Sequence, residues 1–148
     1  MYDKRIDKPG GWSLLALLVV LCLAGCGKKD WPTAQDQEDV FTWESISAER
    51  ESGCLNISAR LGGAVHNLAA VVLELEGSPA ACPECPFQPE SRTFLDLRSP
   101  QIKQEGDRLW ISHCGLEADR TYRFRLRGKN RINGLEDSLS KVIAPSGQ

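Results

Sequence analysis

Cysteine and histidine are the main residues in this 148-residue chain that could bind a soft metal or act as nucleophiles, and the chain has six cysteines and two histidines. Two of the cysteines form the motif Cys82-Pro83-Glu84-Cys85, a spacing found in thiol–disulfide redox pairs and in half of a zinc site. A redox pair needs its first cysteine at a helix N-terminus, but prolines surround this motif and no helical pattern follows it. A zinc site needs a second such pair or paired histidines, whereas His66 and His113 are isolated. We therefore expect a structural disulfide between Cys82 and Cys85 and no metal site, with thiol–disulfide exchange as the alternative.

No nucleophile–base arrangement accompanies the two histidines. Ser112 precedes His113 directly, so in an extended segment the two side chains point to opposite faces. No glycine-rich phosphate loop precedes a helical pattern either. We expect a protein without enzymatic activity and without a bound cofactor.

A stripe of basic residues is the second chemically distinctive feature. Its members alternate along one segment and so share one face of a strand: Arg123, Arg125, Arg127, Lys129 and Arg131. A basic face of this kind can bind phosphates, anionic polysaccharide or lipid headgroups. It can equally be neutralised by acidic residues on a neighbouring strand, so the elements that position it decide between the two.

The overall composition is that of an ordinary globular protein, with 41% hydrophobic and 26% charged residues. The length corresponds to a single domain. Lys and Arg number 18 against 20 Asp and Glu, which gives a net charge of −2. A dedicated nucleic-acid binder is normally strongly basic, so we expect no nucleic-acid partner.

The N-terminal segment has the pattern of an export signal. Lys4, Arg5 and Lys8 precede an apolar run over residues 14–24, which is shorter than the ~20 residues of a membrane-spanning helix. The run ends in Leu23-Ala24-Gly25-Cys26, which resembles the lipobox of bacterial lipoproteins. The resemblance implies that residues 1–25 are a signal peptide and that Cys26 becomes the lipidated N-terminus.

A lipidated Cys26 implies a protein attached to a membrane of the bacterial cell envelope. More than one acyl chain gives stable attachment, because each buried CH₂ contributes ~0.8 kcal/mol. In the lipoproteins that this segment resembles, an aspartate after the lipidated cysteine favours the inner membrane. The resemblance, with Gly27 at this position, therefore implies the periplasmic face of the outer membrane. Residues 26–40 then form the lipidated N-terminus and a flexible tether, because they are polar and show no strand or helix periodicity.

The chain from residue 41 onward alternates apolar and polar residues in short segments separated by turn residues. Seven segments show this pattern: 41–46, 55–61, 71–75, 93–97, 108–114, 122–127 and 138–144. They predict an all-β domain over residues 41–145, a seven-stranded antiparallel sandwich of two sheets, followed by a tail at 146–148.

Residues 115–126 give the most specific fold signal. They run Gly-Leu, a polar turn, Thr121-Tyr122 and then an alternating strand, which resembles the corner between strands E and F of fibronectin type III domains. The resemblance implies a fibronectin type III or immunoglobulin-like sandwich with Leu116 and Tyr122 at the corner, the tyrosine hydroxyl bonding to upstream backbone. Ala59 and Ala118 depart from the family, which usually has tryptophan and proline there.

The same resemblance implies which strands are neighbours. Segments 55–61 and 108–114 would be adjacent strands B and E, which brings Cys54 and Cys114 together as a disulfide. Segments 71–75 and 122–127 would be adjacent strands C and F, which places Glu74 and Glu76 opposite the basic stripe. We favour this charge ladder over anion binding, with Lys129 and Arg131 left unpaired at the loop tip.

The sequence therefore predicts a membrane-anchored, non-enzymatic envelope lipoprotein that presents a protein-interaction or scaffold sandwich to an envelope protein partner. One alternative is a module that binds an envelope polyanion or glycan through the basic stripe. The other is a thiol–disulfide factor that acts through Cys82 and Cys85.

Overall fold

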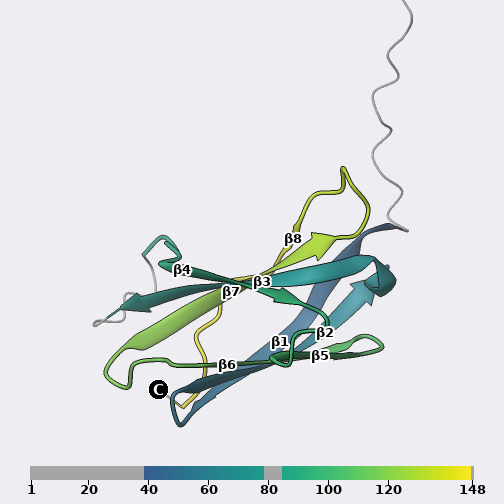
Figure 1. The fold of residues 1–148 in the computed structure, drawn as a ribbon. Helices are drawn as coiled ribbons and strands as arrows, with labels where there is room; N and C mark the ends of the chain where they lie inside the picture. Colours follow the sequence, from purple (N-terminus) through teal and green to yellow (C-terminus); the bar gives the residue numbers. More distant parts are fainter. Residues whose placement is uncertain (1–38, 79–84, 148) are drawn as a thin grey trace, which may run out of the picture. The chain divides into compact units, whose positions relative to one another are not determined.

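Residues 39–78 and 85–147 are described by a computed structural model. They form two four-stranded antiparallel sheets, which confirms the predicted all-β class and the two-sheet sandwich (Figure 1). The strands are β1 (Phe41–Glu51), β2 (Cys54–Gly63), β3 (Leu68–Ser78), β4 (Ser91–Asp96), β5 (Ile102–Glu105), β6 (Arg108–Cys114), β7 (Thr121–Asn130) and β8 (Ser138–Leu139). One sheet has the order β1-β2-β6-β5 and the other β4-β3-β7-β8, and a single 3₁₀ turn (Val65–Asn67) joins β2 to β3.

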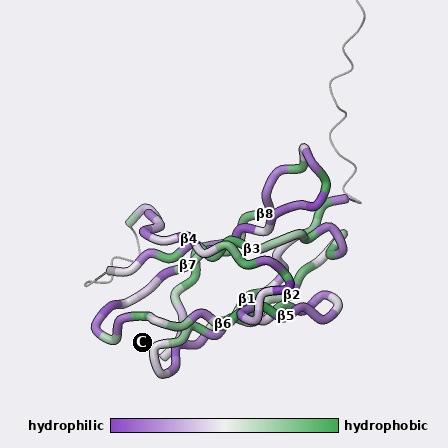
Figure 2. Tube along the Cα trace, viewed as in Figure 1, coloured by the Kyte–Doolittle hydropathy of each residue, from purple (hydrophilic) through white to green (hydrophobic). Residues whose placement is uncertain are grey.

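Alternation along each strand builds the core. In β2 the side chains of Leu55, Ile57, Ala59 and Leu61 are buried, while the intervening residues are exposed. The same alternation buries Tyr122, Phe124 and Leu126 of β7. Apart from Tyr122, these residues join one hydrophobic cluster between the two sheets. Figure 2 shows hydrophobic and hydrophilic colours mixed along the strands, with hydrophilic colour also in the connecting loops. Each sheet therefore has one face in the core and one face toward solvent.

Among the described residues there are eight strands, so the prediction of seven was wrong. The additional strand is β5, an edge strand that pairs with β6. Only Ile102 of its four residues is apolar and buried. A short, mostly polar edge strand has no alternating signal, because its side chains pack against little of the core.

The last predicted strand, 138–144, is also shorter in the structure. Only Ser138 and Leu139 pair with β7 as a strand, and Ile143 makes one further bridge to Phe124. Between them the backbone N–H of Leu126 donates to the hydroxyl of Ser140 at 2.9 Å. A side-chain oxygen thus takes the place of a carbonyl, which interrupts the ladder.

The first strand is longer than predicted, and the C-terminal segment packs beside it. β1 extends to Glu51, with a register shift between Trp43 and Ser45. The N–H of Ser146 donates to the carbonyl of Ala48, and the N–H of Arg50 donates to the carbonyl of Ser146. Ser146 was predicted to begin a tail, but it is bonded to the domain.

Within the described part of the chain, no helix has the length and apolar character needed to cross a bilayer.

Candidate functional site

The outer face of the sheet β1-β2-β6-β5 carries a row of side chains that crosses all four strands. The strand registers place Ser47 opposite Ser58, Ser58 opposite Trp110, and Trp110 opposite Lys103. A parallel row begins with Glu49, Asn56 and Ser112 and continues to Gln101, whose carbonyl accepts a hydrogen bond from the N–H of Ser112. Neighbouring strands lie ~4.8 Å apart, so the two rows form a continuous polar surface around one indole ring.

Trp110 lies on this face because its neighbours in the chain occupy the core. Leu109 and Ile111 are buried, so the alternation of β6 turns the indole outward, where it is half-buried. The ammonium group of Lys103 lies 5.9 Å from the centre of the Trp110 ring and pairs with Glu105 at 2.6 Å. The Lys103 side chain is 70% exposed, so both of its contacts are weak.

A hollow of about 450 Å³ covers this part of the face. Its walls include the backbone and side chains around Trp110, from Ser47 and Ser58 on one side to Gln101 and Lys103 on the other. This volume lies within the ~300–1,000 Å³ range of ligand sites.

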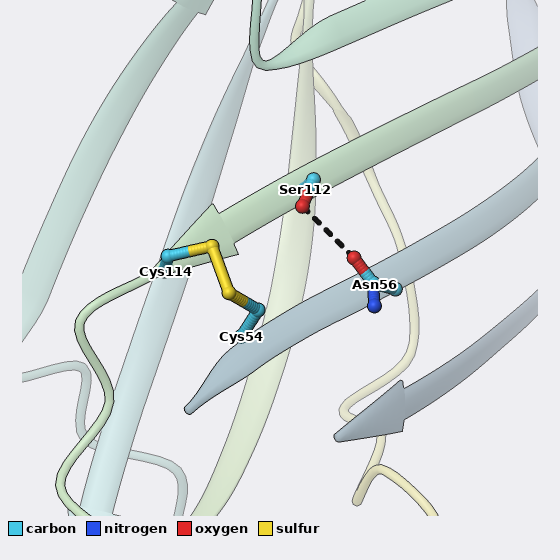
Figure 3. Close-up of a disulfide and its surroundings, with 4 residues drawn as sticks. All are labelled: Cys54, Asn56, Ser112 and Cys114. Atoms are coloured by element: carbon cyan, nitrogen blue, oxygen red, sulfur yellow. Dashed lines mark hydrogen bonds between the residues drawn. A yellow bond between two sulfur atoms is a disulfide. The ribbon is translucent and has the colours of Figure 1, made fainter. Parts of the chain in front are cut away.

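The hydrogen-bonding groups around Trp110 are mostly neutral. The hydroxyl of Ser112 donates to the side-chain oxygen of Asn56 at 2.8 Å, and the amide nitrogen of Asn56 points away from Ser112 (Figure 3). The side chains of Ser47, Ser58 and Gln101 are exposed beside the Trp110 ring. Hydroxyl and amide groups both donate and accept, so this surface can match a ligand rich in hydroxyls.

A disulfide closes one end of the face. Cys54 and Cys114 are bonded, as the sequence predicted, and they lie directly opposite each other in β2 and β6 (Figure 3). Gly115 donates its N–H to the carbonyl of Gly53, so the cysteine pair occupies a non-hydrogen-bonded position of the ladder. Backbones approach most closely at such positions, and the Cα atoms here are 3.9 Å apart, below the expected ~4.4–6.8 Å. The disulfide therefore ties β2 to β6 one row beyond Asn56 and Ser112.

The second predicted disulfide is only partly within the described residues. Cys85 is disulfide-bonded. Cys82, its predicted partner, lies outside the described residues, so that pairing stays a prediction.

The basic stripe lies on the outer face of the other sheet and is neutralised there by acidic side chains. Arg123 pairs with Glu76, and Arg125 and Arg127 both pair with Glu74, as the charge ladder predicted. The prediction that Lys129 is unpaired was wrong, because its ammonium lies 2.6 Å from Asp137 in the loop before β8.

Arg131 is the member of the stripe that stays exposed, and it makes no ion pair with any described residue. The other four basic residues of the stripe face three carboxylates, those of Glu74, Glu76 and Asp137. The stripe is therefore mainly an internal charge ladder that fixes the register of β3 and β7.

Glu74 is the most unusual member of the ladder, because its carboxylate is fully buried. Burial alone raises the pKa of Glu74, but hydrogen bonds and charges from Arg125, Arg127 and Arg92 outweigh this effect and lower the pKa below its usual value. The carboxylate therefore stays ionised at neutral pH and holds three guanidinium groups together.

The predicted corner is present at the start of β7. The hydroxyl of Tyr122 accepts a hydrogen bond of 3.0 Å from the backbone N–H of Glu117, which lies upstream as expected. Leu116 packs against the core, and the guanidinium of Arg50 lies 5.2 Å from the centre of the Tyr122 ring. The corner tyrosine thus links the β6–β7 connection to β1.

The two histidines lie apart from the outer face around Trp110. His66 is exposed beside the 3₁₀ turn. His113 is half-buried, its Nδ1 has no hydrogen-bond partner among the described residues, and burial lowers its pKa. The described residues contain no cluster of three or more histidine, cysteine or acidic side chains that could hold a metal ion.

Sequence reasoning did not single out the Trp110 face. One signal was available, since the alternation that buries Leu109 and Ile111 already places a large aromatic ring on the solvent side. The neighbours of that ring come from three other strands, among them β5, so they became visible only with the sheet order.

No family model and no curated protein match this chain. Among solved structures, its fold is similar to that of a candidate carbohydrate-binding protein from Bacteroides uniformis, with a TM-score of 0.41 and 10% sequence identity. The similarity covers 70% of this chain and 55% of that chain. At this level, the likeness supports no conclusion about what this chain binds.

Proposed function

We propose that this chain is a lipid-anchored protein of the bacterial cell envelope, whose β-sandwich is a non-enzymatic binding module. We further propose that ligands bind on the outer face of the sheet β1-β2-β6-β5, centred on Trp110.

The anchor part of the proposal rests on the sequence. Residues 1–25 have the order of a secretory signal, a charged start followed by a short apolar run, and the run ends at Leu23-Ala24-Gly25-Cys26. A lipid on Cys26 and a tether reaching residue 40 would hold the domain beside a membrane while leaving its faces accessible.

The sandwich is proposed to be of the immunoglobulin-like type, the group of folds that includes fibronectin type III. The order β1-β2-β6-β5 corresponds to strands A-B-E-D, and β3-β7-β8 corresponds to C-F-G with β4 in the position of C′. The tyrosine at the E–F corner also supports this type. Sandwiches of this kind serve many unrelated functions, so the function must be argued from the site.

The contrast between the two outer faces is the observation that carries the binding proposal. On the sheet β4-β3-β7-β8 the charged side chains are mostly saturated by one another. On the sheet β1-β2-β6-β5, a half-buried indole lies in a hollow among exposed hydroxyl and amide groups. An aromatic ring with surrounding polar groups is the usual composition of a recognition surface.

Photocrosslinking in intact envelopes tests the proposal. A diazirine amino acid at Ser58 would sit on the proposed face beside Trp110, and the same residue at Phe94, 63% exposed on the opposite sheet, is the matched control. We expect a defined adduct from Ser58 and none from Phe94. An adduct from Phe94 alone, or from neither position, would contradict the proposed face.

A further inference from the structure

The structure points to a neutral oligosaccharide as the ligand of the Trp110 face, and we infer that one sugar ring stacks on the indole while its hydroxyl groups bind the surrounding polar side chains. This inference rests on the proposed function, because it names the ligand class of the same face.

The indole supplies the stacking surface. A pyranose ring presents several C–H bonds on one face, and a flat, electron-rich aromatic ring is the protein group that complements such a face. Trp110 is the aromatic residue of the hollow, and the hollow is large enough for a ligand of more than one sugar ring.

The polar groups supply the hydrogen bonds. Each sugar hydroxyl both donates and accepts, so it is best matched by amides and hydroxyls that also do both. The outward side chains of Ser47, Ser58 and Gln101, together with the amide nitrogen of Asn56, lie around Trp110 in this way. The hydrogen bond between Ser112 and Asn56 fixes the orientation of that amide.

Charge favours a neutral ligand over an anionic one. The two rows contain one cation, Lys103, and one anion, Glu49, so their charges cancel. Lys103 is in addition paired with Glu105. A polyanion would meet no surplus of positive charge here to attract it, whereas a neutral sugar needs none.

Lys103 is the group that must move when a ring stacks on Trp110. Its ammonium lies over the indole, but its side chain is 70% exposed and flexible. Because both of its contacts are weak, a ligand can displace it toward solvent at little cost.

The disulfide at one end of the face gives the surface its rigidity. The Cys54–Cys114 disulfide joins the two central strands next to Asn56 and Ser112. A preorganised surface loses less conformational freedom on binding, which matters for a ligand held by many weak contacts.

The test measures binding of chitohexaose, cellohexaose and maltohexaose to the purified full-length lipoprotein by calorimetry, in a detergent without a sugar headgroup. We expect at least one of them to bind, with an affinity unchanged when salt rises from about 0.05 to about 0.5 M. Trp110→Ala should weaken binding about tenfold or more, because the stacking surface is lost. Trp110→Phe should retain much of it, and Phe94→Ala on the other sheet should leave it unchanged.

Three results would overturn the inference. The first is no binding of any of the three sugars by wild type whose circular dichroism shows a folded sheet. The second is equal binding by Trp110→Ala. The third is binding of dextran sulfate alone, lost at high salt and in Lys103→Ala, which would make the ligand anionic. A protein adduct from the Ser58 crosslinker together with no sugar binding would reject the oligosaccharide and leave the proposed binding face standing.

Discussion

Glu74 and Arg125 face each other across β3 and β7, and their side chains form a partly buried ion pair on what would otherwise be a solvent face. The guanidinium of Arg125 donates to one carboxylate oxygen from two nitrogens, at 2.8 and 2.5 Å. Arg127 and Arg92 bind the other oxygen at 3.1 and 3.2 Å. The carboxylate is 0% exposed, so three cations replace the water that would otherwise solvate it.

We predict that Glu74→Gln destabilises the domain by about 1.5–3 kcal/mol at pH 7, because charge-assisted hydrogen bonds to a buried carboxylate are lost. The pKa of Glu74 is lower in the folded state than the ordinary value of 4.5, so its contribution is complete above that value. It is lost as pH falls through the lowered pKa. Urea denaturation should therefore show the two proteins converging in stability below pH 4.5.

Glu105→Gln is the control for this experiment. Glu105 pairs with Lys103 on the surface, where its side chain is 58% exposed. Its replacement should change stability by less than about 0.5 kcal/mol. A Glu74→Gln protein as stable as this control would mean that the buried carboxylate contributes no net stability.

The Cys54–Cys114 disulfide should contribute strongly to stability. It closes a loop with a sequence separation of 60 residues, for which the chain-entropy model gives about 4 kcal/mol. We expect a reducing agent to lower the melting temperature of wild type and of a Cys82→Ser/Cys85→Ser variant by similar amounts, measured by calorimetry. A drop confined to wild type would assign the stabilisation to the Cys85 disulfide instead.

Tyr122→Phe removes one hydroxyl and leaves the ring in place. The N–H of Glu117 loses its acceptor, which should cost about 0.5–1.5 kcal/mol in urea denaturation. Tyr122→Leu should cost more, because the contact of the ring with Arg50 is lost as well. An unchanged midpoint for Tyr122→Phe would show that the corner hydrogen bond adds nothing.

The proposed lipid anchor predicts the behaviour of Cys26→Ala. Without the thiol there is no acceptor for the lipid, so the precursor should keep residues 1–25 and take up no labelled palmitate. Wild type should be labelled and should fractionate with membranes. Equal labelling of both proteins would rule out Cys26 as the lipidated residue.

The sequence by itself determined the faces of most strands. Alternation depends only on the local requirement that one face be apolar, so it assigned Leu55 and Ile57 to the core and turned Cys54 outward. It likewise buried Phe124 and placed Arg125 on the opposite face. The Gly-Leu and Thr-Tyr pattern of residues 115–122 then located the corner at Tyr122, because a motif within a few residues needs no knowledge of distant strands.

The tertiary structure alone decided the other contacts between side chains on different strands. Lys129 finds Asp137 because the loop before β8 folds back, and Glu74 is buried because β4 adds Arg92 to the two arginines of β7. The row from Ser47 to Lys103 likewise depends on β5, whose polar sequence gives no strand signal. Such contacts are fixed by sheet order and register, which arise from pairing between distant segments rather than from any local pattern.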